Sequence, residues 1–161
     1  MDGTADLGVN CEKDHYPDTV VHKKLGTYQA MLVASPEADS RLLDFVTPHQ
    51  RKPVSLICNE PEGYYQMDMD RYLEARDIRL EPYMKLQSIE AVKRCVMSNL
   101  GLAVVPTYSV EEELKNGSLV PVKTELDEKL YHSVYVYHKN KWLSPQMELA
   151  LKFLKQTVGV K

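Results

Sequence analysis

Segments with the pattern of buried strands alternate with segments with the pattern of amphipathic helices along most of the chain. The clearest strand covers residues 54–58, which have the length and composition of a buried strand in a parallel sheet. A helix is predicted to follow over residues 64–76, because its apolar side chains recur at i, i+4, i+7 and i+8. Such alternation is typical of a largely parallel sheet covered by helices on both faces. The sequence therefore predicts an α/β fold.

Further strands and helices are expected on both sides of this pair. The other predicted strands cover residues 5–9, 20–25, 28–34, 83–86, 102–105, 119–122 and 131–138. Gly26 and Thr27 are interpreted as the tight connection between two of them. The other helical patterns lie at residues 42–46, after Ser88 as N-cap, at 110–115 after Ser109, and after Ser144-Pro145. Gly101 is expected at the C′ position of the helix that Ser88 begins.

Composition limits the kinds of partner this chain can have. Twenty Lys and Arg residues against 23 Asp and Glu residues give a formal net charge of −3, and no stretch is basic enough to follow a phosphate backbone. We therefore do not expect this chain itself to bind nucleic acid. The first residues lack a secretory signal, and the longest uncharged run, 95–110, is too short to cross a membrane. Three cysteines without C-x-x-C spacing favour a reducing cytoplasm.

The patterns of the common catalytic and metal sites do not occur in the sequence. The five histidines show neither H-x-x-x-H spacing nor close pairing with a cysteine, so no metal site is expected. G-x-S-x-G, G-x-G-x-x-G and P-loop patterns are missing as well, and we expect neither a cofactor nor an enzyme. A redox sensor that works through Cys58 or Cys95 is a minor alternative.

Polar residues follow three of the predicted strands directly. They are Asn10-Cys11, the loop 59–63, and Gln87-Ser88. In open parallel sheets, ligands bind at the carboxyl ends of strands, where helix N-termini present unbonded N–H groups. Each position alone also has an ordinary interpretation as a helix cap, a turn residue or a small half-buried side chain. Their convergence on one edge predicts a cleft for a small polar ligand.

Several segments, in order, resemble one family of regulators. Residues 87–106, QSIEAVKRCVMSNLGLAVVP, together with Val110, Leu114 and the GSLV of residues 117–120, resemble the effector-binding domain of LysR-type transcriptional regulators. Residues 2–9 are similar to the family's G-x-x-D-L-G-I strand, 28–36 to its first crossover strand, and 143–145 to the start of its last helix. The resemblance covers nearly the whole chain.

The resemblance implies a fold of two Rossmann-like lobes joined by two crossover strands, as in type 2 periplasmic binding proteins. Lobe II would be residues 34–134, and lobe I would be residues 1–33 and 135–161. Family domains begin further upstream, and a winged helix-turn-helix that binds DNA precedes them. Lobe I is therefore expected to be incomplete and to expose apolar surface or an unpaired sheet edge.

The resemblance also implies a function and a site. A small metabolite, by family default a small organic acid, would bind between the lobes and modulate DNA binding through the missing N-terminal domain of a dimer or tetramer. The implied effector contacts are Asn10, Cys11, Asn59, Glu60, Gly63, Gln87, Ser88 and Ile89. Cys11 and Gln87 depart from the Ser or Thr common at such positions, and Glu60, Glu62 and Glu90 would repel an anion. The alternative is a solute-binding protein of an ABC-type transporter, with an enzyme on the same lobes third.

Overall fold

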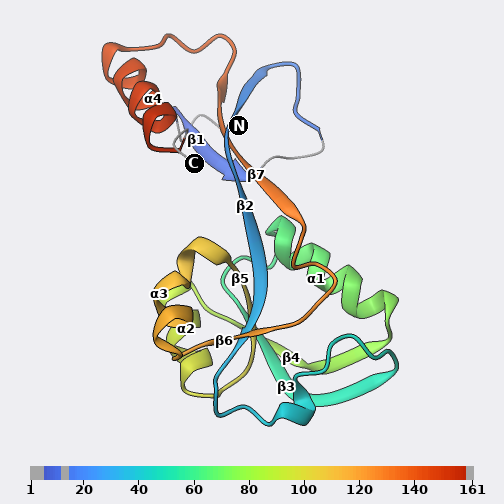
Figure 1. The fold of residues 1–161 in the computed structure, drawn as a ribbon. Coiled ribbons are helices and arrows are strands. Elements are labelled where there is room, and N and C mark those ends of the chain that lie inside the picture. The colour runs from blue at the N-terminus through green and yellow to red at the C-terminus, as the bar shows by residue number, and fades with distance from the viewer. Residues whose placement is uncertain (1–5, 12–14, 159–161) are drawn as a thin grey trace. The chain divides into compact units, whose positions relative to one another are not determined.

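The chain forms two compact units in the computed structural model, which describes residues 6–11 and 15–158 (Figure 1). Unit 1 comprises Met1–Tyr28 and Tyr131–Lys161, and unit 2 is Gln29–Leu130. The sequence placed the two divisions after residues 33 and 134, a few residues further along the same connecting strands.

The strands that connect the units belong to one sheet with the order β1-β7-β2-β5, in which β6 also pairs with β2. The bounds are β1 Gly8–Cys11, β2 Val20–Ala34, β5 Ala103–Pro106, β6 Val120–Val122 and β7 Leu130–His138. The β1–β7, β2–β5 and β2–β6 pairs are antiparallel, so the expectation of a largely parallel sheet is wrong for these strands. Local patterning cannot show that the chain leaves unit 2 on a strand that runs back beside the one by which it enters.

Strand β2 runs without interruption through the predicted turn at Gly26-Thr27, so the expectation of two strands is wrong. Gly26 is not among the described residues with positive φ, and its carbonyl accepts a hydrogen bond from Ser133 Oγ at 3.3 Å. A glycine in an extended strand has the same sequence signature as a glycine in a tight turn, and here it stays extended.

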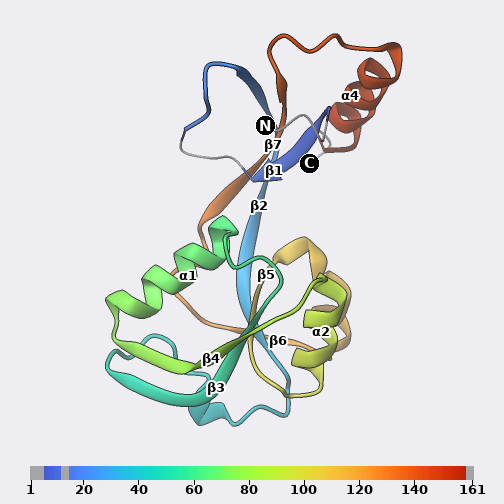
Figure 2. The same cartoon turned by 180° about the vertical axis from the view of Figure 1, so that it is seen from behind.

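Unit 2 contains a parallel pair of strands, β3 Gln50–Cys58 and β4 Ile78–Lys85. Its helices are α1 Tyr64–Ala75, α2 Ile89–Met97 and α3 Glu111–Asn116. Figures 1 and 2 show α1 on one side of these strands and α2 with α3 on the other. The α2 side is packed by a core that includes Val33, Ile57, Val92, Val96, Ala103, Val105, Val110 and Leu119. A parallel bridge from Leu56 to Leu102 connects β3 with the start of β5.

Several predicted boundaries in unit 2 need correction. β3 begins at Gln50 and β4 at Ile78, earlier than the predicted residues 54 and 83. The prediction missed these starts because charged residues and a proline interrupt the apolar pattern of both segments. Ser109 does not cap α3, since its Oγ donates to the Pro106 carbonyl at 2.6 Å within a 3₁₀ turn. The helical pattern over 42–46 is only a 3₁₀ turn at Ser40–Leu42.

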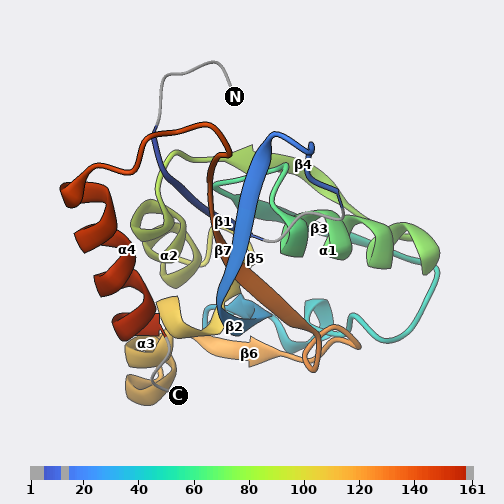
Figure 3. The ribbon, with the colours of Figure 1, turned by 90° about the horizontal axis from the view of Figure 1, so that it is seen from above.

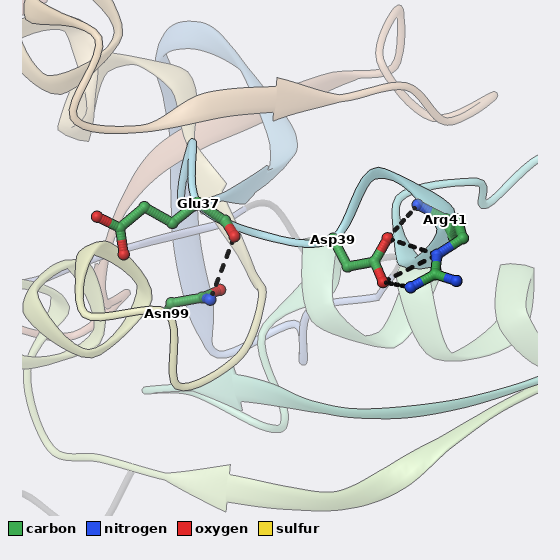
Figure 4. A network of polar contacts seen from close by, with 4 residues as sticks. All are labelled: Glu37, Asp39, Arg41 and Asn99. Atoms are coloured by element: carbon green, nitrogen blue, oxygen red, sulfur yellow. Dashed lines mark hydrogen bonds and ion pairs between the residues drawn. The ribbon is translucent and has the colours of Figure 1, made fainter.

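The end of α2 also differs from the prediction. Asn99, not Gly101, takes the left-handed conformation after the helix, with φ of 57°. Its Nδ2 donates to the Glu37 carbonyl at 3.5 Å, which connects this turn to the loop after β2 (Figure 4). In the same loop, Asp39 Oδ1 accepts the backbone N–H of Arg41 at 2.9 Å.

Unit 1 contains β1 and the helix α4 Pro145–Val158 (Figure 3). The predicted cap of α4 is confirmed, because Ser144 Oγ accepts the N–H of Met147 at 3.3 Å. The predicted strand 5–9 is instead β1, and residue 5 lies outside the described residues. Val9, Trp142, Leu149 and Phe153 are exposed, with Trp142 at 76%. In the described residues, none of the helices has the length and apolar character that a membrane span requires.

Candidate functional site

The carboxyl ends of β3 and β4 lie side by side in unit 2. Cys58 and Lys85 are register partners in the parallel pair, and the Leu86 N–H donates to the Cys58 carbonyl at 2.9 Å. Parallel partners end at the same edge of a sheet, so the loops that leave these strands start next to each other. One loop opens α1 and the other opens α2. The predicted convergence of residues 59–63 with Gln87-Ser88 therefore has a basis in the register.

Ser88 is the N-cap of α2, as predicted. Its Oγ accepts the Ala91 N–H at 3.1 Å, and its carbonyl accepts the Val92 N–H at 3.1 Å. Gln87 beside it is exposed, so its amide is accessible to a ligand. Ile89 packs against the core on the α2 side, so the structure gives this residue a packing contact within the unit.

The start of α1 differs from that of α2 because no side chain caps it. Gly63 is its N-cap, and the Gly63 N–H donates to the Glu60 carbonyl at 2.9 Å. The φ of Gly63 is −69°, so its backbone conformation does not require glycine. A Cβ at this position would lie 3.0 Å from the Glu60 carbonyl oxygen, and this close approach accounts for the glycine. The first turn of α1 also contains no acidic residue. An uncapped helix start carries partial positive charge and attracts anions.

Asn59 is held between the end of β3 and the start of α1. It is half-buried, and its Oδ1 accepts a hydrogen bond from the Tyr65 hydroxyl at 3.4 Å. This contact orients the amide, whose NH₂ group is a donor. Glu60 is exposed in the same loop and brings negative charge near the helix start.

Glu90 opposes an anion less than the sequence suggests. Lys93 Nζ lies 3.0 Å from Glu90 Oε1 and 2.8 Å from Glu113 Oε1, so the Glu90 charge has a partner on its own helix. Although burial lowers the pKa of Lys93, its hydrogen bonds to Glu113 and Glu90 raise that pKa overall.

The predicted contacts Asn10 and Cys11 belong to unit 1. Both lie within β1 rather than beyond it, opposite Val134 and Ser133 of β7. Asn10 is exposed, and the half-buried Cys11 Sγ is hydrogen-bonded to the Tyr28 hydroxyl. The strand extends further than predicted because backbone pairing with β7 holds these two polar residues extended.

A polar network beside the start of α1 was missed by the sequence interpretation. Gln66 is 1% exposed, its Nε2 donates to Asp70 Oδ1 at 3.0 Å, and the Tyr83 hydroxyl donates to the same oxygen. Burial, with Asp70 beside it, raises the pKa of Tyr83. The i, i+4 spacing of Gln66 and Asp70 was the available signal, but only the fold shows that Tyr83 faces them.

The cysteine and metal-ligand groups add little chemistry. Burial, followed by the charge of Asp70, raises the pKa of the Cys58 thiol, so the reactive thiolate is disfavoured. Among the described residues, no three His, Cys, Asp or Glu side chains gather closely enough to hold a metal ion.

A family model described as the LysR substrate binding domain matches residues 1–159. The chain belongs to this family. The resemblance and the α/β fold of type 2 periplasmic binding proteins predicted from the sequence are thereby confirmed. The chain is an effector-sensing regulatory domain. The alternative of a solute-binding protein of an ABC-type transporter is not favoured. The family consists of transcriptional regulators, not enzymes.

Relatives with known names are regulators. The uncharacterized HTH-type transcriptional regulator YfiE of Escherichia coli is 29% identical over 157 residues, covering 98% of this chain and 53% of YfiE. The HTH-type transcriptional activator CmpR of Synechocystis is 27% identical over 99 residues, covering 62% and 33% of the two chains. The matched region thus spans about half the length of YfiE and about a third of the length of CmpR.

Solved regulatory domains share the fold. The bromide-bound regulatory domain of HypT from Salmonella typhimurium has a TM-score of 0.77 at 16% identity, covering 99% of this chain and 75% of that one. The Synechocystis CcmR regulatory domain in complex with 2-PG has a TM-score of 0.72 at 13% identity, covering 98% and 75%.

Proposed function

We propose that this chain senses a small-molecule effector for a longer LysR-type regulator, and that unit 2 contacts the effector at the first turns of α1 and α2. The observation that carries this proposal is the pairing of Cys58 with Lys85, which brings the loops that open both helices to one edge. The proposed contacts in unit 2 are Asn59, Glu60, Gly63, Gln87, Ser88 and Ile89. For Asn10 and Cys11, which belong to unit 1, the contact expected from the sequence stays a prediction.

The proposed effector is a small organic acid. The uncapped start of α1 offers N–H groups and positive dipole charge to a carboxylate, and Asn59 adds an amide donor. Glu60 works against this charge, whereas Glu90 is occupied by Lys93. The effector therefore presents its carboxylate to α1 and a hydroxyl or amide group to Gln87.

The rest of the proposal concerns the whole protein. The named relatives are HTH-type regulators about twice as long as the matched region or longer, which supports DNA binding by another part of the parent protein. Effector binding would shift the population of regulator states that bind DNA differently. We place the parent in the cytoplasm as a homo-oligomer, dimer or tetramer, and assign no catalytic step to this chain.

A ligand screen tests the proposal. Small carboxylic acids and amino acids are screened by thermal shift on the full chain, and hits are measured by titration calorimetry. Ser88→Ala and Asn59→Ala are each expected to weaken binding about tenfold, because each removes one polar contact of about 1.4 kcal/mol.

Ser144→Ala is the matched control for Ser88→Ala. Both serines cap a helix, so both variants should lose about 1 kcal/mol of stability. Only Ser88→Ala should change effector affinity. A saturable effector whose affinity neither Ser88→Ala nor Asn59→Ala alters would show that the site lies elsewhere.

A further inference from the structure

The ladder between β3 and β4 is broken near the start of both strands. Arg51 pairs with Arg79, and the next partners are Ser55 and Glu81, so residues 52–54 lie opposite Leu80 alone. The surplus residues on β3 include Pro53, which has no N–H to donate to a ladder. The strands therefore separate locally.

The separation leaves a hollow of about 440 Å³. It is lined by Arg51, Lys52, Pro53, Arg79, Leu80 and Glu81. The proposed effector contacts follow Cys58 and Lys85, at the other ends of the same strands. At about 3.3 Å per residue, the six steps from Lys52 to Cys58 span about 20 Å. The hollow is therefore separate from those contacts.

Two arginines stand beside each other at this hollow. Arg51 and Arg79 are register partners, and partners on neighbouring strands project from the same face about 5 Å apart. Like charges in such a pair repel each other. Arg79 Nε donates to Asp77 Oδ1 at 3.0 Å, which leaves its other N–H groups for a second acceptor. Within the described parts of the chain, Arg51 makes no ion pair.

A third cation in the lining is buried. Lys52 is 4% exposed, and its Nζ lies 5.1 Å from the centre of the Phe45 ring. Burial lowers the pKa of Lys52, and the nearby Asp44 only partly opposes this. Asp44 Oδ1 is occupied by the N–H groups of Val46 and Thr47, each at 3.0 Å. Over residues 6–11 and 15–158, no carboxylate lies within ion-pair distance of Lys52, and such a buried charge is costly.

We propose that this hollow binds a small oxyanion of the phosphate class, held by Arg51 and Arg79, with a longer-range attraction from the buried Lys52. Two guanidinium groups side by side match a tetrahedral oxyanion, which can accept two N–H bonds from each. The anion relieves the repulsion between the arginines. Lys52 projects from the other face of β3, so its buried charge acts on the anion only from a longer distance. Glu81 in the same lining repels the anion, so the affinity is modest. Salt screens the attraction between the arginines and the anion, so the affinity falls as the ionic strength rises.

Inorganic phosphate is the probe for the test. The full chain is titrated at constant ionic strength with chloride as the reference anion, by thermal unfolding and by amide NMR shifts. Phosphate is expected to raise the Tm, because a ligand of the folded state stabilises it, and to shift the amide signals of Lys52 and Leu80. The double variant Arg51→Gln/Arg79→Gln should fold and bind phosphate at least about tenfold more weakly.

Arg41→Gln is the control for the arginine variants. The Arg41 side chain is 87% exposed and pairs with Asp39 (Figure 4). Arg41 does not line the hollow, so this variant should bind phosphate normally. Lys52→Met, which keeps the side-chain length without the charge, should also weaken binding. Equal effects of phosphate and chloride, or unchanged binding by the double arginine variant, would overturn the proposal. Binding of a DNA duplex but not of phosphate through these arginines would overturn it as well.

Discussion

A methyl carbon at Gly101 would lie 2.5 Å from the carbonyl oxygen of Ser55. The two segments are joined by backbone hydrogen bonds, since the Leu102 N–H donates to Ser55 at 3.0 Å and the Ile57 N–H donates to Leu102 at 2.7 Å. Gly101 is buried and is not among the described residues with positive φ. It is therefore a glycine because β3 passes so close, and not because the chain turns there.

Gly101→Ala is expected to destabilise the chain by about 3 kcal/mol, because a backbone oxygen cannot move aside without breaking the contact between β3 and β5. Urea unfolding measures the change. Gly117→Asn is the control, since Gly117 has φ of 75° with nothing within 4 Å, and asparagine tolerates this conformation. Its cost should stay within about 0.5 kcal/mol. Equal costs for the two variants would contradict the close approach of Ser55.

Asn99 follows Ser98, the C-cap of α2, and its φ of 57° leads to a second prediction. Asn99→Ala should cost about 1 kcal/mol, because alanine is strained in the left-handed region. Asn99→Gly should stay within about 0.5 kcal/mol of the wild type, since it loses only the long bond to Glu37. Thermal and urea unfolding of both variants test the order. A glycine variant less stable than the alanine variant would exclude backbone strain as the main effect.

Sequence patterns were sufficient where local chemistry determines the structure. Ser88 and Ser144 cap their helices as predicted, because caps depend on residues within one turn. The neighbouring ends of β3 and β4, at Cys58 and Lys85, were also predictable, because consecutive β-α units produce neighbouring parallel strands.

The failures occurred where distant segments decide the structure. Gly26 stays extended within the continuous strand β2, where Ser133 Oγ donates to its carbonyl. Gly101 was assigned to a helix end, although its close contact is with Ser55. Nor does sequence spacing show that Tyr83 bonds to Asp70, since that contact requires β4 to lie against α1. Close approaches between segments leave no periodic signal in the chain.

The turn after β2 has a carboxylate that should titrate far below its usual range. Hydrogen bonds from Thr47, followed by the backbone N–H of Val46, lower the pKa of Asp44 to about 2. A lowered folded-state pKa means that the stability contribution is present above the unfolded pKa of about 4 and is lost as the pH falls towards about 2.

Carbon NMR titration of the Asp44 carboxyl measures this pKa directly. Asp44→Asn should be less stable than the wild type near neutral pH, and the difference should shrink as the pH falls from about 5 to about 2. A pKa of Asp44 near 4 in the folded chain would show that the Thr47 and Val46 bonds do not persist in solution.

Lys93 connects α2 to α3 through its ion pair with Glu113 at 2.8 Å. Its side chain is only 10% exposed and that of Glu113 is 15% exposed, so Lys93→Met leaves a carboxylate in a largely buried place without its cation. We expect a loss of about 2 kcal/mol, less than for a fully buried pair, because water still reaches both groups. The double variant Lys93→Met/Glu113→Leu should recover part of this loss.

Lys115→Met is the control, because Lys115 is 77% exposed and lies 3.8 Å from Glu111, and it should change the stability by less than about 0.5 kcal/mol. Urea unfolding compares the four proteins, and a Lys93→Met variant as stable as Lys115→Met would show that the bridge does not hold α3 on α2.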